Sequence, residues 1–270
     1  MGNQPEVPAD IYDKNYYLTD NEGFREYTKG LDRQMHSKYQ QALELGAPKA
    51  GDIVLDIGCG RAELVYYCAK RQCKALGIDY SQAAIDIAQG TLKQLPPELQ
   101  KIARVQVADV VKTQFPDKYN VVFMIDIVEH MYDWQLQSAF EKINAILAED
   151  GRLIISTPNY YYEKYLSPLK RMLDIPFLMV KIPLRVLRGK FKPTSFIEVV
   201  RKIFRVWPDR GATGKQMHVN VMTPGILRKY FKDFDAKVYC HDPSVNPLTF
   251  LLRKWWGREI VVIARKRKPQ

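Results

Sequence analysis

The sequence predicts an α/β protein whose core is a doubly wound, mostly parallel sheet of seven strands. Three observations support this prediction. Short apolar stretches alternate with stretches of helical periodicity, a turn with two glycines follows the first apolar stretch, and one long basic segment interrupts the alternation before the last two strands. Because parallel strands need a crossover connection, usually a helix, this alternation is typical of a sheet with helices on both faces.

The strands are expected where four to six residues, mostly apolar, stand between turn signals. They are residues 52–57, 75–79, 104–109, 120–125, 151–156, 236–240 and 259–263. The helices between them are expected at 62–71, 82–92, 134–147 and 224–231. Ser81 is expected to cap the second of these helices and Thr223 the last, which has Pro224 in its first turn.

The chain is expected to divide into four segments. Residues 1–48 hold a Tyr-rich leader and one helix, predicted over 21–45, that together cover a ligand. Residues 49–159 form the ligand-binding core, and 160–216 form a basic helical insertion that covers the substrate or contacts a membrane. Residues 217–270 complete the core sheet.

Charge and cysteine content narrow the class of protein. The 41 Lys and Arg exceed the 30 Asp and Glu to give a net charge of +11, which indicates an anionic partner. The four cysteines form no Cys-x-x-Cys pair, so no zinc site or disulfide framework is indicated, and we expect no metal. The chain shows no signal-peptide layout, and its longest apolar stretch, 175–187, is too short and too charged to span a bilayer. We therefore expect a cytoplasmic protein.

Two glycines stand at the end of the first predicted strand. Gly58 and Gly60, in the stretch Val54 to Glu63, let the chain turn tightly and let a ligand lie against bare backbone. A dinucleotide-binding loop has a third glycine where Glu63 stands, and here the acid Asp56 precedes the glycines. This difference weakens the dinucleotide interpretation.

Carboxylates stand at the ends of the next two predicted strands. Asp79 follows Gly60 by 19 residues, a position from which an acid accepts hydrogen bonds from both ribose hydroxyls. Asp109 closes the third strand. Acids at the ends of three consecutive strands disfavour a pyrophosphate but suit a ligand with a positive sulfonium and no phosphate.

This combination resembles the class I S-adenosylmethionine-dependent methyltransferases, which have a Rossmann-like fold. The resemblance is to the type 11-like group, including enzymes of surface-glycan and lipid gene clusters, whose first motif reads like Val-Leu-Asp-Ile-Gly-Cys-Gly. It covers residues 50–160 most fully and implies S-adenosylmethionine as the cofactor. The cofactor-binding residues that it implies are Tyr17, Asp56, Gly58, Cys59, Gly60, Asp79, Tyr80, Asp109, Val110 and Asp126.

The resemblance also implies a role for each part of this set. The loop that begins at Asp56 would lie under the methionine part, Asp79 would hold the ribose, and Asp109 with Val110 would meet the adenine. Asp126 would lie beneath the methionine and the sulfonium. One departure is Ala62, which stands where the pattern has glycine and is tolerable unless that residue needs a positive φ.

Three residues are candidates for catalysis. His130 comes just past the fourth strand and is the leading candidate for a general base, with its neighbour Glu129 as the second. His218 would fold back over the pocket from the insertion and resembles a histidine at this place in related enzymes. The alternative is that Glu129 and His130 orient the loop, and that His218 is an ordinary surface residue. In the leader, Tyr16 or Tyr17 would form part of the lid or would pack the first helix onto the sheet.

The basic insertion raises the question of the partner. Between Glu163 and Lys215 there are thirteen basic and four acidic residues, an excess of nine out of the net +11. Large apolar residues lie among these cations, so residues 164–207 are expected either to bind an anionic membrane surface, at the inner face of the membrane, or to cover the pocket.

The sequence therefore predicts a methyltransferase that O-methylates a glycan, a lipid-linked acceptor or another small amphipathic acceptor. An RNA methyltransferase that uses the insertion, and a non-catalytic S-adenosylmethionine-binding protein, are the alternatives, although the sequence contains no recognisable RNA-binding module. The oligomeric state is left open.

Overall fold

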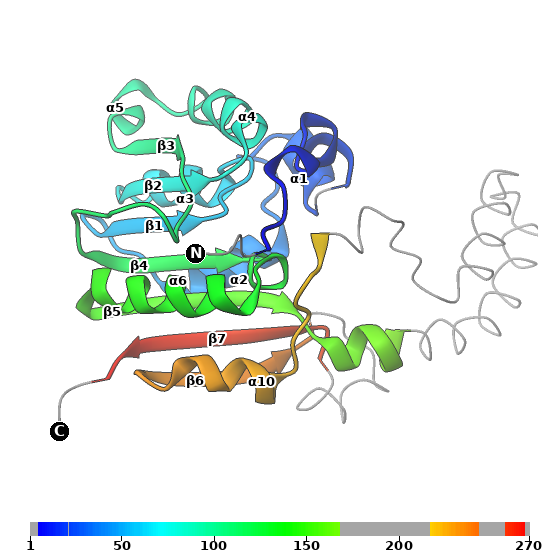
Figure 1. The fold of residues 1–270 in the computed structure, drawn as a ribbon. Helices are drawn as coiled ribbons and strands as arrows, with labels where there is room; N and C mark the ends of the chain where they lie inside the picture. Colours follow the sequence, from blue (N-terminus) through cyan, green and yellow to red (C-terminus); the bar gives the residue numbers. More distant parts are fainter. Residues whose placement is uncertain (1–4, 21, 168–216, 243–256, 268–270) are drawn as a thin grey trace, which may run out of the picture.

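The computed structural model describes residues 5–20, 22–167, 217–242 and 257–267. These residues form a seven-stranded sheet in the order β3-β2-β1-β4-β5-β7-β6 (Figure 1). The strands are β1 (Ile53–Ile57), β2 (Lys74–Asp79), β3 (Ala103–Val107), β4 (Tyr119–Ile125), β5 (Leu147–Pro158), β6 (Phe234–His241) and β7 (Glu259–Lys266). The first five are parallel, and β7 is antiparallel to β5 and β6. The predicted α/β, mostly parallel fold is confirmed.

Helices cover both faces of the sheet. They are α1 (Phe24–Lys29), α2 (Ser37–Gly46), α3 (Glu63–Lys70), α4 (Gln82–Leu92), α5 (Pro97–Gln100), α6 (Asp133–Ile146) and α10 (Pro224–Arg228). Ser81 caps α4 by accepting from the Ala84 N–H, and Thr223 caps α10 by accepting from the Ile226 N–H, as predicted.

The single helix expected over residues 21–45 is wrong. The structure has two helices there, because Gly30 ends α1 with a φ of +99° and residues 31–36 run without a helix to α2. The apolar spacing across this region is compatible with one continuous helix, but a residue with positive φ interrupts any α-helix.

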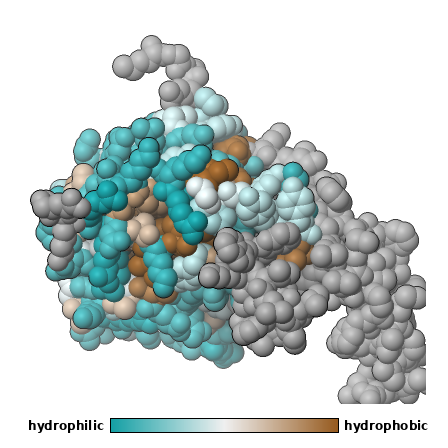
Figure 2. All heavy atoms as spheres, turned by 90° about the horizontal axis from the view of Figure 1, so that it is seen from below, coloured by the Kyte–Doolittle hydropathy of each residue, from teal (hydrophilic) through white to brown (hydrophobic). Residues whose placement is uncertain are grey.

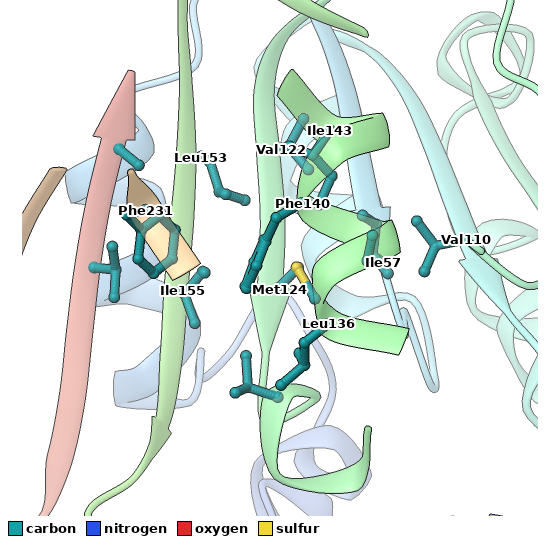
Figure 3. Close-up of a cluster of buried hydrophobic side chains, with 14 of the residues drawn as sticks. Ile57, Val110, Val122, Met124, Leu136, Phe140, Ile143, Leu153, Ile155 and Phe231 are labelled. Atoms are coloured by element: carbon teal, nitrogen blue, oxygen red, sulfur yellow. The ribbon is translucent and has the colours of Figure 1, made fainter. Parts of the chain in front are cut away.

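The core lies in two layers, one on each face of the sheet. Along β4, Val122 and Met124 pack with Leu136 and Phe140 of α6 (Figure 3), whereas Val121 and Phe123 belong to the layer formed by α2, α3 and α4. Successive strand residues point to opposite faces, so a strand with helices on both sides is apolar throughout. This explains why the central strands read as continuous apolar runs.

Among the described residues, the outer strand β6 has a neighbouring strand on one side only. The two exposed residues of β6, Asp235 and Lys237, are charged. From below, most of the described surface is hydrophilic, with smaller apolar areas between the polar side chains (Figure 2). Charged side chains on an edge strand disfavour pairing with another chain.

The N-terminal segment lies at the carboxyl ends of the parallel strands (Figure 1). Most of the predicted insertion, residues 168–216, lies outside the described residues, and the division of the chain into four segments stays a prediction. No helix among the described residues is long and apolar enough to cross a membrane.

Candidate functional site

A cavity of about 710 Å³ opens at the carboxyl ends of β1, β2 and β4, beneath the N-terminal segment. Its volume is in the range of about 300–1,000 Å³ that small-molecule sites occupy. Ends of parallel strands are where open α/β sheets bind ligands. The predicted site residues all line this cavity: Tyr17, Asp56, Gly58, Cys59, Gly60, Asp79, Tyr80, Asp109, Val110, Asp126, Glu129, His130 and His218.

The loop after β1 needs its glycines. Gly58 has a φ of +72°, and a Cβ there would lie 1.9 Å from the Ile127 side chain. Gly60 has a φ of +49°, and a Cβ there would meet the ring of Tyr17 at 3.5 Å. The N–H groups of Gly58 and Cys59 both donate to the Ile78 carbonyl, which fastens the loop to β2. The backbone therefore forms a tight floor to the cavity.

Ala62 also takes the left-handed conformation, with a φ of +63°. The family pattern has glycine at this position, and alanine there is costly only if the residue has a positive φ. The left-handed conformation of an L-residue such as Ala62 costs roughly 1–2 kcal/mol. Ala62 is fully buried directly before α3. Packing of its methyl group in the core offsets part of this cost.

Asp79 ends β2 and faces the loop. Its two oxygens accept from the Gly60 N–H and the Ser81 N–H, each at 3.0 Å. Burial raises the pKa of Asp79 to about 6, although these hydrogen bonds lower it. A carboxylate has about four acceptor positions, so Asp79 can accept further hydrogen bonds from ligand hydroxyls.

Asp56 and Asp109 differ in their surroundings. Asp56 is buried, and its pKa is raised well above the usual range, first by burial and then by Asp79 and Glu63. Asp109 lies two residues beyond β3, not at its end as predicted, because pairing with β2 stops at Val107. It accepts from the Val111 N–H at 2.8 Å, so it shapes the turn as well as lining the cavity.

Tyrosines of the N-terminal segment cover the cavity. Tyr17 is buried beside Gly60, and the ring of Tyr12 packs edge-on against Tyr16 and Tyr80 at 5.3 and 5.5 Å between centroids. The Tyr12 hydroxyl lies 2.7 Å from Nδ1 of His130. Tyr12 of the leader therefore contacts the candidate catalytic residue His130 directly. The sequence analysis did not predict this contact.

Glu129, His130 and His218 come together at one side of the cavity. Nε2 of His130 lies 4.0 Å from Oε1 of Glu129, and the rings of His130 and His218 pack edge-on at 4.8 Å between centroids. Glu129 is fully buried and accepts from the Thr157 hydroxyl at 2.8 Å. Burial first, and then the charge of Asp126, raise its pKa to about 8.

His130 has a defined orientation. Its Nδ1 lies 3.0 Å from the Met217 carbonyl oxygen. A carbonyl only accepts, so Nδ1 donates in this contact, and the Tyr12 hydroxyl, 2.7 Å from the same atom, then acts as a second acceptor. In this tautomer the lone pair is on Nε2. Two contacts at Nδ1, one of them from the residue next to His218, thus orient the imidazole.

The same three side chains could also hold a metal ion. Their ligand atoms lie within 4.8 Å of one another. The expectation of no metal rested on cysteine and histidine spacing along the chain, which does not show that Glu129, His130 and His218 meet in space.

The family model described as "Methyltransferase domain" matches residues 27–241. The chain belongs to this family. The prediction of an S-adenosylmethionine-dependent methyltransferase family is therefore confirmed at the level of the domain.

Similar proteins include both N- and O-methyltransferases. A probable (S)-tetrahydroprotoberberine N-methyltransferase 2 from Papaver bracteatum is 29% identical over 52% of this chain and 40% of its own length. A ubiquinone biosynthesis O-methyltransferase from Aeromonas salmonicida is 30% identical over 57% of this chain and 64% of its own length. This chain therefore spans less than two thirds of either relative.

A solved structure supports the fold. The N-methyltransferase NodS from Bradyrhizobium japonicum has a TM-score of 0.51 and 13% identity, over 88% of this chain and 97% of that chain. At this identity the likeness shows the Rossmann-like methyltransferase fold alone.

Two buried cations beside the cavity were missing from the site predicted from the sequence. Arg61 donates to the carbonyls of Tyr17 and Glu22, each at 2.8 Å, and pairs with Glu63 at 3.0 Å. It thereby ties the N-terminal segment to the glycine loop. Lys38 lies among carboxylates beside the cavity. In the sequence, only its position in the glycine loop pointed to a role for Arg61 at the site. Nothing in the sequence pattern indicated that Lys38 would lie beside the cavity.

Proposed function

We propose that this protein transfers a methyl group from S-adenosylmethionine to a hydroxyl of a small acceptor. The observation that carries the proposal is that one cavity joins the glycine loop and Asp79 to the cluster of Glu129, His130 and His218. A ligand held along the loop would thus have its reacting end near a base.

The residues present fit the proposed methyl donor. The donor supplies a methyl group on a positive sulfonium when it is bound. Asp79 offers acceptors for ribose hydroxyls, and the tight backbone at Gly58 and Gly60 lets a ligand lie against the loop. Asp56 and Asp126 add carboxyl groups to the cavity wall, which favour a cationic ligand where they are ionised.

The chain's contribution to the chemistry is positioning and proton removal. Methyl transfer is an in-line displacement, so holding the acceptor oxygen in line with the methyl group supplies much of the rate enhancement. The oxygen forms a bond to the methyl carbon while the carbon–sulfur bond breaks, and the electron pair of that bond stays on sulfur. We assign the proton of the acceptor hydroxyl to Nε2 of His130, whose Nδ1 faces the Met217 carbonyl.

An amine acceptor is the second candidate, because relatives of this chain include proteins named N-methyltransferases. A neutral amine would bond to the methyl carbon and then lose its proton to the same base. The proposed acceptor class, a glycan, a lipid-linked compound or another small amphipathic compound, rests on the sequence of the basic insertion.

The test is methyl transfer from radiolabelled S-adenosylmethionine to separate glycan, lipid, amine and RNA fractions, with the product atom identified by NMR. We expect label in a hydroxyl-bearing small molecule. Label in RNA would establish the nucleic-acid alternative. Tight donor binding without transfer to any fraction would favour a non-catalytic binding protein.

A further inference from the structure

Lys38 is a buried lysine that joins three parts of the chain. It lies on α2 and is only 8% exposed. Its Nζ contacts Asp126 at 2.5 Å, Glu22 at 2.8 Å and Glu259 at 3.4 Å. These acids belong to the loop after β4, to the N-terminal segment and to the start of β7. A buried lysine is stable only when it is paired in this way.

Asp126 is held in an unusual conformation at the cavity wall. Its φ is +55°, and its N–H donates to the Ser156 carbonyl at 2.9 Å. Nζ of Lys38 donates to Oδ2 of Asp126, whereas the buried Oδ1 of Asp126 has no hydrogen-bond partner among the described residues. The Asp126 side chain is 30% exposed and lines the cavity, so the protein fixes the carboxylate there while part of the side chain stays accessible to a ligand.

We propose that Lys38 is a positioning residue for the methyl donor. It fixes the Asp126 carboxylate at the cavity wall, where the accessible part of that carboxylate accepts a hydrogen bond from the ammonium group of the donor's amino-acid part. Because Lys38 lies on α2, the same contact holds the N-terminal segment over the cavity. This inference rests on the proposed function, since it takes S-adenosylmethionine as the ligand.

The charge of Lys38 is part of this role. Several titratable groups either interact with Asp126 or pair with the same lysine. They are Tyr39 from α2, Glu129 from η3 (Val128–His130), Glu259 from β7, and Glu22. Lys38 is the one positively charged side chain among these groups. Arg258 adds a second cation nearby, but its pairing is with Glu22, at 2.7 Å.

Removal of the Lys38 charge should therefore leave several acids close together. Asp126 then lacks the cation that fixes its side chain, so the affinity for the donor should fall.

The experiment measures S-adenosylmethionine affinity by calorimetry at pH 7. The variants are Lys38→Met, Lys38→Arg and, as a control at an exposed position, Lys29→Met. Lys38→Met should weaken binding roughly ten-fold or more. Lys38→Arg should recover most of the affinity, and Lys29→Met should match the wild type.

A second variant keeps the test decisive if Lys38→Met does not fold. Asp126→Asn keeps the shape of the side chain but removes its charge, and it should weaken donor binding by a similar factor. Wild-type affinity in this variant, or in folded Lys38→Met, overturns the proposal. Failure of the wild-type protein itself to bind the donor overturns the proposed function as well.

Discussion

At the residue scale, His130 is oriented by contacts from two distant segments. Tyr12 and the Met217 carbonyl both reach Nδ1, and Glu129 lies on the side of Nε2. A base held in this way loses little entropy when the acceptor binds, which is why it is the candidate for proton removal.

We expect His130→Ala to lower turnover by roughly 10²-fold or more with little change in donor affinity. Steady-state rates and calorimetry measure the two quantities, and His241→Ala, outside the cavity, is the matched control. A parallel fall in affinity and turnover would make His130 structural.

Turnover should also survive exhaustive chelation. A loss of turnover that a divalent cation restores would instead make Glu129, His130 and His218 metal ligands.

Glu129 should make the stability of the protein depend on pH. Its folded-state pKa of about 8 exceeds the ordinary value of 4.5, so the folded state holds a proton that the unfolded state releases. The contribution of this bound proton to the free energy of unfolding is complete below about pH 4.5 and is lost as the pH rises through 8. Chemical denaturation of Glu129→Gln, which can still accept from the Thr157 hydroxyl, should show a flatter profile between pH 4.5 and 8. A decline as steep as that of the wild type would contradict this assignment.

At the element scale, α3 starts from an alanine in a left-handed conformation. Ala62→Gly should change the free energy of unfolding by less than about 1 kcal/mol. Relief of the backbone cost, roughly 1–2 kcal/mol, is offset by loss of the buried methyl, about 0.8 kcal/mol, and by the greater flexibility of glycine when unfolded, about 0.5–1 kcal/mol.

The matched variant is Ala62→Val, at the same buried position. A β-branched residue is strongly disfavoured at positive φ and has little room there, so destabilisation by about 2 kcal/mol or more is expected. Urea denaturation of both variants measures these changes. Equal stability of Ala62→Val and the wild type would show that α3 starts differently from the structure described above.

At the scale of the whole molecule, the distribution of charge suggests a surface for a partner. The excess of nine positive charges between Glu163 and Lys215 leaves the remainder of the chain close to neutral. Residues 168–216 lie outside the described residues, so membrane contact through 164–207 stays a proposal from the sequence.

We expect co-sedimentation with vesicles that contain anionic lipid, weakening as salt is raised, since each basic residue near such a surface contributes about 1 kcal/mol. Replacement of Phe177, Leu178 and Met179 by polar residues should reduce binding further. Equal partition into neutral and anionic vesicles would favour a lid. Tight, salt-sensitive RNA binding in place of vesicle binding would point to nucleic acid.

The sequence by itself determined the sheet, its helical layers and the position of the cavity. Gly58, Gly60, Asp79 and Asp126 could be placed because apolar periodicity locates the strands, and parallel strands bring their carboxyl ends to one edge. These signals are local, so one segment at a time is enough to read them. The helix predicted over 21–45 failed because apolar spacing alone did not show that Gly30 would take a positive φ.

Only the tertiary structure decided which distant side chains meet. The pairing of Lys38 with Asp126 and the contact of Tyr12 with His130 each join segments far apart in the chain. Such contacts depend on how the helices and the leader pack on the sheet, and this packing is set by shape and burial rather than by any period in the sequence. For that reason the walls of the cavity were predictable, while the charges and contacts that hold them in place were not.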